Sequence, residues 1–201
     1  FRLDIVVGQG ASARTMQIDL VPFTIIGATT RSGLLSNPLR DRFMAHLNFD
    51  YYRPAELSKI LANNAKKLAI SLEEKANNMI AERSRGTPRI ANRILRRVRD
   101  FALINGNQLV CEKEVSKALN LLDIDRLGLD ATDRRILHVM KDYYKGGPVG
   151  IDALAATMGE DKQTIEEVYE PYLLKEGIIL RTSRGRMLSQ KALDHDLDAL
   201  S

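Results

Sequence analysis

The sequence predicts a mostly α-helical protein in three successive parts, with strands confined to its two ends. Residues 1–50 contain alternating and continuous runs of β-branched residues, the pattern of strands. Residues 54–122 carry apolar residues at helical spacing, and residues 123–201 combine three helical segments with two short strands. The length of 201 residues allows one or two domains of roughly 100–200 residues each.

Residues 3–20 are predicted to form a β-hairpin, because apolar residues alternate on both sides of a turn at residues 8–12. The continuous β-branched run Phe23–Thr29 is predicted to be a buried strand of a parallel sheet, and Ala45–Phe49 a further strand. Two such strands without a crossover helix do not complete an α/β domain. Residues 1–50 are therefore expected to be the tail of an α/β domain whose first part is absent.

Four helices are expected in the middle part. The second is predicted to be capped by Ser71, with Glu74 three residues later, and the fourth runs from Glu112 to Leu122. The other boundaries rest on residues that favour helix ends or turns, namely Pro54, Gly86, Pro88 and residues 105–107. This part is predicted to be an all-helical unit.

Residues 123–201 are predicted to form, in order, three helices, a strand, a loop and a second strand. Helices are predicted at Ala131–Tyr144, with Tyr143 facing inward, at Ile151–Met158, and from Asp161 to just before Gly177. The strands are Ile178–Leu180 and Met187–Leu188, joined by the polar loop Arg181–Arg186. This order is that of a winged-helix domain, a helix-turn-helix variant with an appended β-hairpin.

Charge is divided unequally along the chain. Residues 1–122 have a net charge of +8 and residues 123–201 of −4, which indicates an anionic partner for the first part. The one cysteine, Cys111, excludes an internal disulfide and a thiolate metal site, and fits a reducing cytoplasm. No apolar run approaches the ~20 residues of a spanning helix, and no signal peptide opens the chain. A cytoplasmic protein without a membrane partner is expected.

Two segments of the first part could act on a nucleotide. Thr29 and Thr30 follow a predicted parallel strand, where such sheets bind ligands, although a threonine there is also commonly structural. Pro38–Phe43 contains Arg40 and Arg42. Paired arginines are commonly a solvated face, but arginine is also the residue that an oligomer inserts into a neighbour's nucleotide site.

Seven arginines lie from residue 83 to residue 99, a stretch that contains no acid and follows Glu82. Arginine's planar fork suits bidentate phosphate or carboxylate contacts. Arg85 and Arg89 flank a predicted helix N-terminus, itself favourable for anions. Three further arginines fit a solvated helix face or a subunit contact as well as a phosphate site: Arg93, Arg96 and Arg97.

The loop at residues 181–186 is basic in an otherwise acidic part of the chain. Arg181, Arg184 and Arg186 could neutralise DNA phosphates, and a polar turn is the simpler alternative. The preceding helix carries Glu166, Glu167 and Glu170, which are expected on its exposed face, where they would repel a duplex backbone. If this part binds DNA, the loop and not the helix is predicted to make the contact.

No complete catalytic site is present in the sequence. It contains no Gly-x-x-x-x-Gly-Lys-Ser/Thr loop, no Asp-Glu pair after an apolar strand and no Ser/His/Asp set. Any reaction is therefore expected to need residues beyond those given.

Five segments in order resemble one family: residues 27–31, 38–43, 85–93, 146–150 and 181–186. Together they are similar to the RuvB family, AAA+ ATPases that drive Holliday junction branch migration in bacteria. The resemblance implies the C-terminal part of an AAA+ nucleotide-binding domain at residues 1–50, a helical lid at 51–122 and a winged-helix DNA-binding domain at 123–201. It also implies ATP and Mg²⁺, whose P-loop and metal ligands would lie outside this sequence.

The resemblance further implies a homo-hexameric ring on double-stranded DNA, recruited to the Holliday junction by RuvA and acting indirectly with the RuvC resolvase. It implies Thr29 and Thr30 as the first sensor, Arg42 as an arginine finger, and Arg89 as the second sensor on the lid. It implies nucleotide contacts by Tyr52 and Phe1, DNA contacts by Arg181, Arg184 and Arg186, and RuvA contacts by Met16 and Ile18. The alternatives are a stand-alone winged-helix DNA-binding protein, or another AAA+ switch such as a clamp loader or an origin-binding protein.

Overall fold

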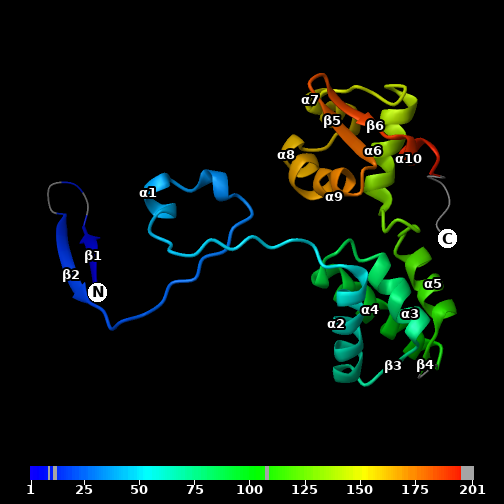
Figure 1. Cartoon of the computed structure of the whole chain (residues 1–201), viewed down its shortest axis with the longest axis horizontal. Helices are drawn as coiled ribbons and strands as arrows, with labels where there is room; N and C mark the ends of the chain where they lie inside the picture. The colour runs from blue at the N-terminus through cyan, green and yellow to red at the C-terminus, as the bar shows by residue number, and fades with distance from the viewer. Residues whose placement is uncertain (9, 11–12, 107–108, 196–201) are drawn as a thin grey trace. The chain divides into compact units, whose positions relative to one another are not determined.

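The computed structural model describes residues 1–8, 10, 13–106 and 109–195. The chain divides into two units, residues 1–48 and residues 49–201 (Figure 1). The described part is mostly helical, as predicted, and its few strands form three two-stranded sheets. None of its helices is both long and apolar enough to cross a membrane.

The predicted hairpin is confirmed in the first unit. Strand β1 (Arg2–Val7) pairs antiparallel with β2 (Arg14–Asp19), and the register places Leu3 opposite Ile18 and Ile5 opposite Met16. Of the expected turn, residues 9, 11 and 12 lie outside the described residues. A short 3-10 turn, η2 (Ser32–Leu34), and one helical turn, α1 (Asn37–Arg40), follow.

The two strands predicted after the hairpin are absent from this unit. Phe23–Thr29 and Ala45–Phe49 are irregular and exposed, and Ile26 exposes 92% of its surface. A parallel strand needs hydrogen-bonded neighbours on its edges, and no described strand pairs with either segment. The β-branched composition alone therefore does not create a strand, and the described residues of this unit include none that are buried.

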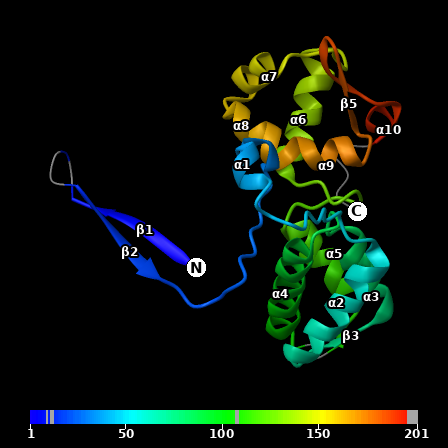
Figure 2. The ribbon, with the colours of Figure 1, turned by 60° about the vertical axis from the view of Figure 1, so that its left-hand side comes forward.

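The middle part is the predicted four-helix unit, called the lid below. Its helices are α2 (Pro54–Lys67), α3 (Glu74–Glu82), α4 (Pro88–Ile104) and α5 (Glu112–Leu121), which pack together as one bundle (Figures 1 and 2). Their shared core includes fully buried leucine, isoleucine and valine side chains: Leu57, Leu61, Ile80, Ile94, Leu95, Val98 and Val115.

A small parallel pair of strands closes the lid. β3 (Ser71–Leu72) pairs with β4 (Leu109–Val110), so Ser71 lies in a strand and does not cap α3 as predicted. Glu73 occupies the position before the helix, and its backbone N–H donates to the Val110 carbonyl at 3.0 Å. Of the turn predicted at residues 105–107, residue 107 lies outside the described residues.

The last part has winged-helix topology. It comprises α6 (Ala131–Asp142), α7 (Ile151–Met158), α8 (Lys162–Thr164), the π-helical turn η3 (Ile165–Tyr169), α9 (Glu170–Lys175), β5 (Ile179–Thr182), β6 (Gly185–Leu188) and α10 (Gln190–Leu193). The third predicted helix is thus three consecutive segments. Pro171 in the first turn of α9 has no N–H to donate to the preceding turn, which accounts for the break.

One inward-facing residue was wrongly predicted here. Tyr143 caps the C-terminal end of α6 with helical backbone angles, yet exposes 73% of its surface. Its neighbour Tyr144 packs against the core instead. The core residues predicted on α6, Ile136, Val139 and Met140, are buried as expected.

The hairpin β5–β6, called the wing below, is held to the domain through Val149. Val149 and Arg186 exchange two backbone hydrogen bonds of 2.8 Å. Gly185, at φ +131°, makes this approach possible, since a Cβ there would lie 2.3 Å from the Val149 carbonyl oxygen. The base of the wing is therefore fixed to the segment that contains Val149.

Candidate nucleotide and nucleic-acid contacts

The predicted sensor and finger segments meet in the first unit. Thr29 accepts a hydrogen bond on its hydroxyl from the Arg31 backbone N–H at 3.0 Å, and Thr30 is exposed. A Cβ at Gly27 would lie 3.5 Å from the ring of Phe43, which directly follows the exposed Arg42. Phe1 stacks beside Phe23 with ring centroids 5.8 Å apart. Threonine hydroxyls and Arg42 thus belong to neighbouring segments of an open surface.

A turn of the lid brings two predicted nucleotide contacts together. The backbone N–H of Tyr52 donates to the Gly86 carbonyl at 2.9 Å, and Arg89 lies in the first turn of α4, three residues after Gly86. Both side chains are exposed. Lys175 reaches the same turn, with its Nζ 4.2 Å from the centroid of the Tyr51 ring. A cation at the N-terminus of a 17-residue helix is a favourable environment for a phosphate.

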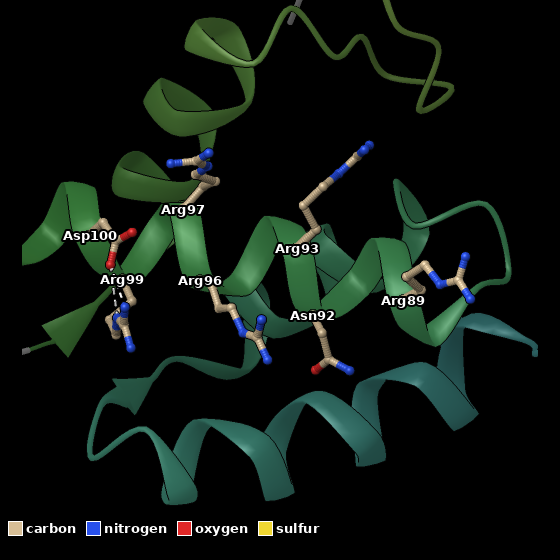
Figure 3. Close-up of a pocket in the computed structure, with 7 residues that line it drawn as sticks. All are labelled: Arg89, Asn92, Arg93, Arg96, Arg97, Arg99 and Asp100. Carbon is tan, nitrogen blue, oxygen red and sulfur yellow. Dashed lines mark hydrogen bonds and ion pairs between the residues drawn. The ribbon is translucent and has the colours of Figure 1, made fainter.

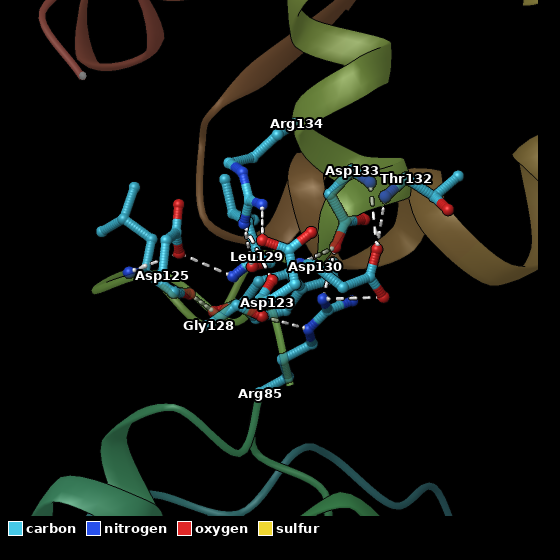
Figure 4. A network of polar contacts seen from close by, with 11 residues as sticks. Arg85, Asp123, Asp125, Gly128, Leu129, Asp130, Thr132, Asp133 and Arg134 are labelled. Carbon is cyan, nitrogen blue, oxygen red and sulfur yellow. Dashed lines mark hydrogen bonds and ion pairs between the residues drawn. The ribbon is translucent and has the colours of Figure 1, made fainter. Parts of the chain in front are cut away.

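Unlike Arg89, Arg85 has a largely buried side chain, although the sequence suggested a phosphate role for it. Its side chain is 12% exposed and forms an ion pair with Asp133 of α6 (Figure 4). The Nε donates to the Gly128 carbonyl at 2.6 Å, and an Nη lies 3.3 Å from an Asp130 oxygen. Arg85 therefore joins the lid to the winged-helix domain.

Sequence reasoning missed this joint, in which Asp130 and Asp133 also form a capping box at the start of α6. Burial raises the pKa of Asp133 to about 6, and the Arg85 charge offsets only part of that effect. Arg85 also stacks 5.0 Å from the centroid of the Tyr172 ring, and the Tyr172 hydroxyl donates to the Leu127 carbonyl at 2.6 Å. A second arginine, Arg134, supports the connector by donating to the Leu129 carbonyl at 3.1 Å.

The three arginines of the wing have different surroundings. Arg184 lies at the exposed tip, where its backbone N–H donates to the Thr182 hydroxyl at 3.2 Å. Arg181 has a half-exposed side chain that pairs with Glu170 at 2.8 Å. Arg186 is buried, and donates to Glu170 at 2.8 Å and to Glu166 at 2.9 Å.

The expectation that Glu170 lies on the exposed face of its helix is wrong. Glu170 is 2% exposed, because the helix turns it under the wing. Burial alone would raise the pKa of Glu170, but the hydrogen bonds from Arg186 and Arg181 outweigh it and lower the pKa. Glu167 does remain exposed and Glu166 half-buried. Arg184 is the wing arginine that is exposed and pairs with no acid among the described residues.

A shallow hollow of about 540 Å³ along α4 is lined mainly by arginines (Figure 3). Its lining residues are Arg89, Asn92, Arg93, Arg96, Arg97, Arg99 and Asp100.

The hairpin of the first unit has an apolar face. Met16 is 51% exposed and Ile18 half-buried, and they share one face with Leu3 and Ile5.

Three family models match consecutive parts of the chain. Residues 1–49 match the Holliday junction DNA helicase RuvB P-loop domain, residues 52–125 the RuvB AAA lid domain, and residues 126–196 the RuvB C-terminal winged helix domain. These matches follow the three parts of the fold in order.

Curated relatives and solved structures agree with these matches. The Holliday junction branch migration complex subunits RuvB of Kosmotoga olearia and Paramagnetospirillum magneticum are each 51% identical over 195 residues. The alignment covers 97% of this chain and 57% and 56% of those relatives, so the chain spans a little over half their length. The structure of the Thermotoga maritima RuvB Holliday junction branch migration motor matches with a TM-score of 0.82 and 49% identity, over 87% of this chain and 58% of that one.

Proposed function

The chain belongs to the RuvB family, and on that premise we propose that it forms part of an ATP-driven motor that moves Holliday junctions in recombination and repair. The proposed parts are residues 1–50 of the nucleotide-binding domain, a lid at 51–122 and a winged-helix DNA-binding domain at 123–201. The bacterial relatives support a cytoplasmic setting. The family matches favour this proposal over a stand-alone winged-helix protein and over a clamp-loader or origin-binding switch.

The observation that carries the proposal is the meeting of Tyr52 and Arg89 at one turn of the lid. A nucleotide beside this turn would have an aromatic ring near its base and a guanidinium near its phosphates. Arg89 fits an anionic ligand, because it is exposed at a helix N-terminus and no described acid pairs with it. We assign Arg89 the second-sensor role and Tyr52 and Phe1 the remaining nucleotide contacts.

The proposed roles in hydrolysis fall on the first unit. Thr30, with Thr29, would orient the attacking water, and Arg42 would reach into the site of a neighbouring subunit in a hexameric ring. An arginine acting in this way stabilises the transition state more than the ground state. Among the described residues no three carboxylates, histidines or cysteines come together as a metal site, so we assign none of them to the Mg²⁺ that accompanies ATP.

A chimera tests the proposal. This chain would replace the matching part of Thermotoga maritima RuvB, and branch migration of a synthetic four-way junction would be measured with RuvA and ATP. Active migration that is lost in Arg42→Ala, while nucleotide binding persists, is the expected result. Contributions of such arginines reach about 10³–10⁵ in rate. A folded, nucleotide-binding chimera that does not move the junction would contradict the proposal, as would full activity of the Arg42→Ala variant.

A further inference from the structure

Besides Arg89, three arginines of α4 have no charge partner in the described part of the chain. Of the residues lining the hollow on this helix, Arg99 pairs with Asp100 at 2.6 Å, and Asn92 accepts a hydrogen bond from Asn64 at 2.7 Å. Arg93, Arg96 and Arg97 make no hydrogen bond or ion pair there and are exposed. We call these three residues the lid arginine face.

The like charges of the lid arginine face destabilise α4. Arg93 and Arg97 are four residues apart and Arg93 and Arg96 three apart, spacings at which like charges on a helix surface repel each other. Figure 3 shows Arg93 and Arg97 pointing to one side of α4 and Arg96 pointing to the other side. Repulsion of this kind is relieved when an anion binds between the guanidinium groups.

We propose that the lid arginine face binds the phosphate backbone of DNA, as a second contact surface separate from the wing. The inference rests on the proposed function for the identity of the polyanion. Arginine's rigid fork matches phosphate oxygens, and Arg93 and Arg97 are one helical turn, about 6 Å, apart along the axis. A row of cations at that spacing can follow one strand of a backbone without reading its bases.

The surroundings favour a nucleic acid over a protein on this face. Stable protein interfaces have an apolar or aromatic core. The apolar residues of α4 beside the arginines face the lid core, and Ile94, Leu95 and Val98 are fully buried. The exposed apolar residues of α4, Leu103 and Ile104, lie beyond the arginines at its C-terminal end.

The salt dependence of duplex binding tests this proposal with the 201-residue chain. The variant Arg93→Gln/Arg96→Gln/Arg97→Gln would be compared with Lys59→Gln/Lys66→Gln/Lys67→Gln, which removes three exposed charges from α2 of the same bundle. Each phosphate contact contributes about −0.9 to the slope of log K against log salt. We expect fluorescence anisotropy to show the slope reduced by about 2 to 3 in the arginine variant and by less than 1 in the lysine variant.

Arginine footprinting gives a second readout that does not depend on a substitution. Phenylglyoxal modification of the wild-type chain, read by mass spectrometry, should slow at Arg93, Arg96 and Arg97 when duplex is added. Equal slopes in the two variants, or modification unaffected by DNA, would overturn the proposal. An unchanged slope with weakened self-association in sedimentation would assign the face to a second copy of the chain instead. Each of these outcomes leaves the chimera result, and with it the proposed function, standing.

Discussion

Arg186 and Glu170 form a double hydrogen bond beneath the wing, with Nε 2.8 Å from one carboxylate oxygen and Nη2 3.0 Å from the other. Both side chains are buried, at 11% and 2% exposure. The pair fixes β6 to the start of α9, so it sets the position from which the tip of the wing projects. Arg186 therefore holds the wing in place, whereas Arg184 at the tip is exposed and available to bind a ligand.

Arg186→Ala should destabilise the winged-helix domain strongly. The substitution leaves Glu170 buried with only the half-exposed Arg181 as a partner, and breaking a buried pair on one side costs about 3–5 kcal/mol. Urea unfolding followed by circular dichroism measures the loss. The control is Arg184→Ala, an exposed site where a change within about 0.5 kcal/mol is expected. Equal stability of both variants would mean that the pair contributes nothing to the domain.

Asp133 should give the protein an unusual pH dependence. Its pKa in the folded protein is about 6 against an ordinary value of 3.8, so between those values the folded state holds a proton that the unfolded state has released. The Asp133 contribution to the unfolding free energy therefore rises as the pH falls from 7 to 5. Relative to Asp133→Asn, the wild type should gain about 1 kcal/mol over this interval. Parallel pH profiles of the two proteins would contradict this.

The apolar face of the hairpin should be required for RuvA binding. Met16→Asp places a charge beside Ile5 on the exposed face, and should abolish capture of the chain by immobilised RuvA. The circular dichroism spectrum should not change, since this unit has no described core to disrupt. Thr15→Asp, on the opposite face of the same strand, is the matched control. Equal capture of both variants would remove the face from the interface.

The 201-residue chain by itself should not hydrolyse ATP. Phosphoryl transfer in P-loop ATPases relies on a lysine-bearing loop and a metal-binding acid, and the sequence contains neither motif. Phosphate release measured with a coupled assay should match a protein-free blank, with or without duplex DNA. Turnover that is lost in Arg42→Ala would show that the chain completes a site on its own and would refute the prediction.

The sequence was sufficient for features that depend on neighbouring residues and insufficient for those that depend on distant ones. The lid helices follow from periodicity, together with a proline in the first turn of α2 and of α4, and α7 has the predicted bounds. Phe23–Thr29 was predicted as a strand because composition does not say whether a pairing partner exists.

In the candidate site, too, the individual residues could be predicted from local motifs, but the contacts between distant segments could not. Arg89 and Tyr52 were identified from short motifs, but the turn that joins them depends on a hydrogen bond across 34 residues of chain, from Tyr52 to Gly86. The burial of Arg85, Arg186 and Glu170 depends on how separate helices pack, and each of these residues reads as a surface charge in the sequence. Among the three wing arginines, a count of charges does not show that Arg186 is buried against Glu170 and Glu166.

The most direct test of this account is the salt dependence of duplex binding by Arg184→Ala. We propose that the wing contacts the phosphate backbone through the exposed Arg184 at its tip and does not read bases. The slope of log K against log salt should therefore decrease by about 0.9 relative to the wild type, and by the same amount on two duplexes of unrelated sequence. An unchanged slope would remove Arg184 from the DNA contact. A strong preference for one duplex would contradict backbone recognition.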